Sequence, residues 1–131
     1  MRNLVFSVLF LMFGSLSLQA QCGTNCLYTV STFSNKSCTS GSFDWTTKVD
    51  ICIRNFGVPD NRCIIDVTNT SSSTYFVELD VPATSQTFSY SLTAGQCKLS
   101  ITSWAINDDV EIRVYDGSNF DCTAEFNVNC L

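Results

Sequence analysis

Apolar and polar residues alternate along short stretches of this chain, and no stretch has the three-to-four-residue apolar spacing of an amphipathic helix. The clearest alternating runs cover residues 49–54, 75–81, 88–92, 97–102 and 110–114, and weaker runs cover 27–33, 63–67 and 126–130. A period of two is typical of strands with one buried face. In each run we expect the apolar set to face the core, for example Cys97, Leu99 and Ile101.

The breaks between these runs are rich in residues that favour turns. They cover 40–42, 57–61, 69–74, 82–85, 94–95, 107–109 and 116–119, and both prolines, Pro59 and Pro82, lie within them. Short strands at regular spacing, separated by turns, indicate an all-β fold. We predict an antiparallel β-sandwich of about eight strands, with the Ser/Thr-rich residues 68–74 as an exposed loop.

The first 20 residues differ from the rest of the chain. Arg2 precedes an almost wholly apolar stretch over residues 4–18, and Ala20 has the small side chain that suits the last position before a cleavage site. The stretch is short for a membrane span, and no basic cluster follows it. We predict a signal peptide over residues 1–20 and a single secreted, extracellular domain over residues 21–131.

All eight cysteines lie after residue 20. An even number of cysteines in a short exported chain indicates disulfide bonds, although the sequence does not choose among the many pairings. Zinc is disfavoured because the chain has no histidine and no Cys-x-x-Cys pair. We predict that four disulfides use all of Cys22, Cys26, Cys38, Cys52, Cys63, Cys97, Cys122 and Cys130.

The charge of the chain narrows the choice of partners. Residues 21–131 contain six basic and twelve acidic residues, a net charge of −6. An acidic surface repels phosphate, so we expect no nucleic-acid partner and no binding to anionic lipid by charge alone. Two N-glycosylation sequons, at Asn35 and Asn69, lie in predicted loops, and we expect them to be solvent-facing and available to carry glycans.

The absence of histidine also disfavours an enzyme. The usual general base near neutral pH is missing, so neither a Ser-His-Asp nor a Cys-His site exists. Paired carboxylates remain the one catalytic alternative, but no pair of acidic residues stands out in so small a domain. We expect no enzymatic activity and no cofactor.

Acidic residues gather near the C-terminus and raise the question of calcium. The candidate ligands are Asp108 and Asp109 before the run 110–114, and Asp116 and Asp121 after it. Calcium requires six to eight oxygen ligands that converge, whereas the two pairs lie at opposite ends of a predicted strand. Asp44, Asp60 or Asp66 would have to supply further ligands. We predict weak or absent calcium binding and assign no metal site.

Several aromatic residues lie outside the regular alternation. An exposed apolar patch is a usual mark of a contact with a partner or a membrane. As candidates for such a patch we take Trp45, Phe56, Trp104 and Phe120.

Parts of the sequence resemble known extracellular sandwiches. Residues 27–35, Cys38, residues 49–56 and residues 97–109 are similar in spacing to the N-terminal, C2-like module of Notch ligands, and residues 97–109 also resemble a strand and loop of C2 domains. The run 109–117, with its Val-Tyr-Asp-Gly ending, is similar to CUB domains, and residues 26–30 resemble PLAT sandwiches. Ala105 stands where the C2 calcium loop usually has an acid. These resemblances imply a C2-like sandwich whose end loops contact lipid, glycan or protein.

Together these features favour a secreted binding module of ligand-like or adhesion type. Its expected partner is a cell-surface protein, glycan or lipid. The alternative is a secreted toxin or defence protein that acts by binding its target.

Overall fold

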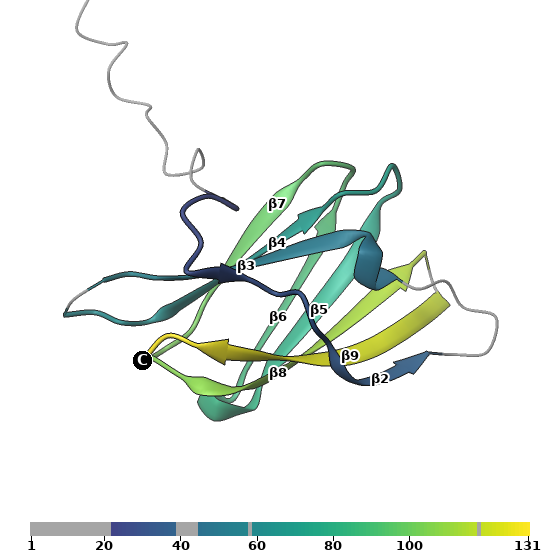
Figure 1. Cartoon of the computed structure of the whole chain (residues 1–131). Helices are drawn as coiled ribbons and strands as arrows, with labels where there is room; N and C mark the ends of the chain where they lie inside the picture. Colours follow the sequence, from purple (N-terminus) through teal and green to yellow (C-terminus); the bar gives the residue numbers. More distant parts are fainter. Residues whose placement is uncertain (1–21, 39–44, 58, 118) are drawn as a thin grey trace, which may run out of the picture.

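The computed structural model describes residues 22–38, 45–57, 59–117 and 119–131, without the side chains of residues 119–121. The predicted signal peptide lies outside the described residues, as does Asp44. In the described part the protein is an antiparallel β-sandwich (Figure 1). The predicted fold class is therefore confirmed.

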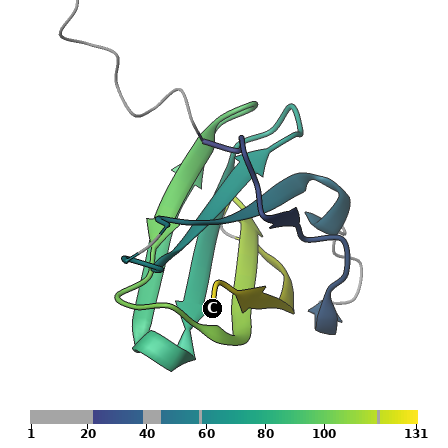
Figure 2. The same ribbon diagram turned by 60° about the vertical axis from the view of Figure 1, so that its left-hand side comes forward.

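Two sheets form the layers of the sandwich, and Figures 1 and 2 show them from two directions. One sheet has the strand order β1 (Tyr28–Thr29), β3 (Val49–Asn55), β4 (Cys63–Asn69), β7 (Cys97–Ile101). The other has the order β2 (Ser34–Cys38), β9 (Asn119–Asn129), β8 (Asn107–Asp116), β5 (Tyr75–Val81), β6 (Gln86–Leu92). The short 3-10 turns η2 (Trp45–Thr47) and η3 (Pro82–Thr84) complete the described elements.

Every predicted run contributes to a strand, but the sequence missed one strand. β2 lies at residues that carry no apolar alternation, and all five of its residues are exposed. β2 forms because it pairs with β9, where Ser34 lies opposite Glu125 and Cys38 opposite Cys122. The weak run 27–33 contributes only the two-residue β1.

The core lies between the two sheets and is built by alternate residues of the long strands. Its fully buried side chains include Ile51, Ile65 and Leu79. Trp45 is also fully buried, and its indole nitrogen donates a hydrogen bond to the Cys122 carbonyl at 2.8 Å. The expectation that Trp45 is an exposed binding residue is therefore wrong. η2 places the Trp45 ring in the core, which supplies both apolar contacts and a hydrogen-bond acceptor for the indole nitrogen.

The eight cysteines form four disulfides, and none remains free, as predicted. Two of the disulfides, Cys38–Cys122 and Cys63–Cys130, tie the ends of β2 and of the chain to the sandwich. The other two, Cys22–Cys97 and Cys26–Cys52, hold residues 22–27 against the outer face of the four-stranded sheet. We call residues 22–27 the strap.

The strap covers a buried ion pair. Asp66 is fully buried and accepts hydrogen bonds from the Gly23 main-chain nitrogen at 2.8 Å and from Arg54 Nε at 2.7 Å. A second Arg54 nitrogen bonds the other carboxylate oxygen at 3.1 Å, so the pair is bidentate. Asp66 is therefore a structural residue and not the loop ligand that the calcium hypothesis required.

The facing of β7 is the opposite of the prediction. Leu99 and Ile101 lie on the outer face and are 41% and 36% exposed, whereas Ser100 is buried. β7 pairs with β4 so that Leu99 lies opposite Asp66, which is on the outer face. Cys97 shares that face, and from there its sulfur reaches Cys22 in the strap. The disulfide thus fixes a facing that apolar alternation alone would have reversed.

Candidate functional site

The remaining candidate aromatics separate into exposed and undescribed residues. Phe56, in the β3–β4 loop, is 47% exposed, and Trp104, in the β7–β8 loop, is 55% exposed. The Arg62 guanidinium stacks on the Phe56 ring at 4.6 Å and also pairs with Asp60 at 2.8 Å. The side chain of Phe120 lies outside the described residues.

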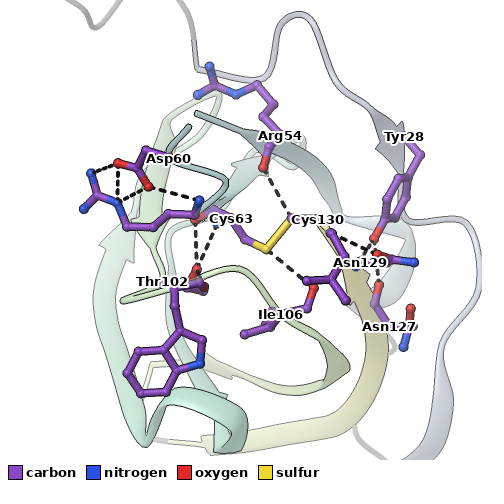
Figure 3. Close-up of a disulfide and its surroundings, with 12 residues drawn as sticks. Tyr28, Arg54, Asp60, Cys63, Thr102, Ile106, Asn127, Asn129 and Cys130 are labelled. Carbon is purple, nitrogen blue, oxygen red and sulfur yellow. Dashed lines mark hydrogen bonds and ion pairs between the residues drawn. A yellow bond between two sulfur atoms is a disulfide. The ribbon is translucent and has the colours of Figure 1, made fainter. Parts of the chain in front are cut away.

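The two loops with these aromatics lie at the same end of the sandwich. Thr102 connects them, because its main-chain nitrogen donates to the Cys63 carbonyl and its hydroxyl donates to the Trp104 carbonyl at 2.6 Å. Figure 3 shows this end around the disulfide Cys63–Cys130, with Asp60 and Thr102 beside it. Phe56 and Trp104 lie on two different loops, and the Asp60–Arg62 ion pair lies next to Phe56.

The calcium candidates do not come together. β8 runs from Asn107 to Asp116, so Asp108 and Asp109 lie at one end of the sandwich and Asp116 at the other, as the sequence indicated. The side chain of Asp121 is outside the described residues. Among the described residues, no group of three or more His, Cys, Asp or Glu side chains is placed to hold a metal ion.

The two sequons lie in different environments. Asn35 is exposed on β2, and its side-chain nitrogen donates to the Glu125 carboxylate. Asn69 is fully buried, and its side-chain nitrogen donates to the carbonyls of Ser73 and Leu92 at 2.6 and 3.0 Å. Asn69 closes β4 and is not an exposed loop residue. The expectation that Asn69 is solvent-facing is therefore wrong. A glycan would replace one of the two hydrogens that Asn69 donates and would have no room in this buried site, whereas glycosylation of the exposed Asn35 stays a prediction.

The outer face of the five-stranded sheet carries a dense group of charged residues. Cross-strand register brings Glu78 opposite Arg113, Asp80 opposite Glu111 and Glu111 opposite Glu125. Asp109 follows on the same face of β8, opposite Asn127. We call this surface the acidic face; its carboxylates are Glu78, Asp80, Asp109, Glu111 and Glu125.

One guanidinium partly compensates these carboxylates. Arg113 bonds Glu111 at 2.7 Å, Glu78 at 3.0 Å and Asp80 at 3.3 Å. The hydrogen bond with Glu111, together with the nearby acids, raises the pKa of Arg113. Five carboxylates against one guanidinium leave a charge of −4 on this face.

Two aromatic rings continue the acidic face along β5 and β8. Phe76 lies opposite Tyr115, with ring centroids 5.9 Å apart, and Phe76 is 40% exposed. An exposed aromatic beside carboxylates suits a cationic side chain, since the ring face and the acids attract the same charge. Sequence reasoning missed this site, although the alternation of Phe76, Glu78 and Asp80 placed all three on one side of a strand.

One pocket of the described structure lies on the outer face of the four-stranded sheet. A pocket of about 530 Å³ lies beside the strap, and Asp50 is the single carboxylate residue in its lining. A glycosidase-type site requires two converging carboxylates.

No helix of the described residues is long and apolar enough to cross a membrane.

Comparison of the chain with protein-family models, with curated proteins and with solved structures finds no match. The resemblances to Notch-ligand, C2, CUB and PLAT sandwiches therefore stay predictions. What the acidic face can bind is therefore inferred from its own carboxylates and aromatic rings.

Proposed function

We propose that this protein is a secreted binding module whose acidic face holds a positively charged segment of an extracellular partner protein. The observation that carries the proposal is the pair Glu111 and Glu125, which lie directly opposite each other on neighbouring strands. Like charges in this position destabilise a sheet. A cationic partner would relieve that repulsion.

The distribution of charge supports this choice of surface. The strands of the five-stranded sheet carry eight acidic and two basic residues, a net charge of −6 (2 − 8). The strands of the four-stranded sheet carry two of each, a net charge of zero. Charge complementarity gives a binding face specificity and a fast association rate.

The same charge favours protein over the other expected partners. Anionic glycans and anionic lipid headgroups would be repelled by the carboxylates of the acidic face. Arg or Lys side chains match both the carboxylates and the Phe76–Tyr115 pair. The disulfides support a location outside the reducing cytosol, and the predicted signal peptide supports secretion.

A comparison of two charge-matched variants tests the proposal. The first, Glu78→Gln/Asp80→Asn/Glu111→Gln/Glu125→Gln, removes four carboxylates from the acidic face. The second, Asp50→Asn/Asp60→Asn/Asp108→Asn/Asp116→Asn, removes four elsewhere. Surface plasmon resonance with immobilised Arg/Lys-rich and Asp/Glu-rich synthetic peptides, and binding of the labelled protein to intact cells, would provide the readouts.

We expect wild type and the second variant to bind the basic peptide and the cell surface in a salt-sensitive manner, and the first variant to lose both. Protease treatment of the cells should remove the binding sites. Equal binding by the two variants would contradict the proposal. Binding that survives protease but is lost after glycosidase treatment or transfers to lipid vesicles would replace the protein partner with a glycan or a lipid.

A further inference from the structure

We infer that two copies of this protein associate through the open edge of β6, with the two β6 strands antiparallel. A strand at the edge of a sheet presents unpaired main-chain groups and invites another strand, so proteins usually protect their edges. This sandwich protects its other edges and leaves β6 open.

The four edge strands differ in their protection. β1 has only two residues. β2 has an irregular register between Ser34 and Ser37 and carries Lys36. β7 has five residues and carries Lys98. Short length, register breaks and lysine are the devices that prevent edge-to-edge pairing.

β6 has none of these devices. Its seven residues contain no charge and no proline, and its register with β5 is regular from Gln86 to Leu92. In the described structure the main chain of residues 87–91 has no backbone partner other than β5. At the end of the strand the side chain of Gln86 bonds the Ser103 main chain at 2.7 Å, which leaves the middle of the strand uncovered.

The sequence of β6 is complementary to itself. Antiparallel pairing centred on Ser89 places Phe88 of one copy opposite Tyr90 of the other, and Thr87 opposite Ser91. Phe88 and Tyr90 are both half-buried and pack against the core from the edge, so a second strand would cover their remaining apolar surface. Cross-strand aromatic and hydroxyl pairs are stabilising.

Charge does not oppose this association. The nearest carboxylates, Glu78 and Asp80, lie on β5, and Asp80 already accepts a hydrogen bond from Thr87 at 2.6 Å. The two β5 strands would be three strand spacings apart, about 14 Å, which exceeds the screening length of about 8 Å at physiological salt. Residues 21–131 carry a net charge of −6, and within them β6 is a neutral edge along which two copies can approach.

Pairing through a single edge strand buries a small area, so we expect a reversible dimer with a dissociation constant in the range of about micromolar. The symmetry is isologous, because the same strand serves both copies. The two acidic faces would then lie on one continuous sheet.

Sedimentation equilibrium of the secreted, disulfide-bonded protein over a wide concentration range tests the dimer. Wild type should reach twice the monomer mass, and Thr87→Lys and Ser91→Lys should each do so too, because the new lysine faces a hydroxyl. The double variant Thr87→Lys/Ser91→Lys places lysine opposite lysine twice, and its dissociation constant should rise about tenfold or more. Thr87 and Ser91 are exposed in the monomer, so the circular dichroism spectrum of the double variant should match that of wild type.

Ser34→Lys/Ser37→Lys adds the same charge to β2 and should dimerise as wild type does. Hydrogen exchange of the β6 amides should slow as concentration rises. Wild type that stays monomeric at millimolar concentration would overturn the inference. Equal weakening by the single and double variants, or by the β2 control, would also overturn it, because neither result follows from pairing centred on Ser89.

Discussion

The outer faces of the two sheets place acidic residues in opposite environments. On the four-stranded sheet Asp66 is fully buried beneath the strap, where Arg54 and the Gly23 main chain supply three hydrogen bonds. On the five-stranded sheet Glu78 and its neighbours remain partly exposed and share one guanidinium. The disulfide-bonded strap covers the first face at Asp66, and no segment of the described structure covers the acidic face.

This difference separates structural charge from charge that is available to a partner. Burying a carboxylate is costly unless it is fully paired, so the buried Asp66 needs its hydrogen bonds from Arg54 and Gly23. Partly exposed carboxylates keep most of their hydration, and they tolerate an excess of negative charge at small cost. An unbalanced face can therefore be retained without unfolding the domain.

The largest effect should follow from breaking the buried pair. Asp66→Ala leaves Arg54 buried without its partner, and we expect a loss of about 3–5 kcal/mol in the free energy of unfolding, measured by denaturant titration. The double variant Asp66→Ala/Arg54→Leu should recover part of this loss, since it removes the unpaired charge. Glu78→Ala on the acidic face should cost less than about 1 kcal/mol. Equal losses for Asp66→Ala and Glu78→Ala would break the comparison.

Releasing the strap should have the next largest effect. Cys22→Ala/Cys97→Ala removes the disulfide with a sequence separation of 75, and Cys26→Ala/Cys52→Ala removes the one with a separation of 26. Each should lower the unfolding free energy by about 2–4 kcal/mol, with the larger loss for the longer loop. Exchange of the Gly23 amide with solvent should accelerate, since its bond to Asp66 depends on the strap. Unchanged exchange would show that the strap holds without its disulfide.

Tyr90, half-buried on the edge strand β6, places an ionisable side chain in a third environment. Burial raises the pKa of this phenol from 10.0 to about 12. Below about pH 10 the phenol is neutral in both states, and between pH 10 and 12 only the unfolded chain ionises, so stability falls as pH rises. This group should account for about 2–3 kcal/mol of lost stability by pH 12. Tyr90→Phe should lack that part of the pH dependence.

The smallest effect concerns the like-charge pair of the acidic face. Glu125→Gln keeps an acceptor for Asn35 and removes the repulsion with Glu111, so it should raise the unfolding free energy by up to about 1 kcal/mol. The gain should shrink at high salt, because exposed charges are screened. Glu78→Gln serves as the control, since it weakens an ion pair with Arg113 and should give no gain. A loss of stability for Glu125→Gln would mean that the opposed carboxylates cause no strain.

Part of the candidate site was accessible from the sequence. The alternation over residues 75–81 and 110–114 predicted strands β5 and β8, and with them the side of each strand on which the charges lie. That the two strands are neighbours, with Glu78 opposite Arg113, follows from pairing between segments that are far apart in the chain. Trp45 and Asn69 were misplaced for the same reason, because their burial depends on contacts with Cys122 and Leu92.

The sequence by itself determined every described strand except β2, the full use of the cysteines and the acidity of the domain. These properties depend on neighbours along the chain, on residue counts and on the chemistry of thiols. Only the tertiary structure decided which acids are buried and which face a partner. Asp66 lies on β4 and Glu78 on β5, and both are acidic residues in predicted strands. Asp66 accepts a hydrogen bond from Gly23 of the strap, 43 residues away in the chain, whereas Glu78 lies under no such cover. The position of a carboxylate relative to solvent depends on which distant segment covers it, and local alternation carries no information about that cover.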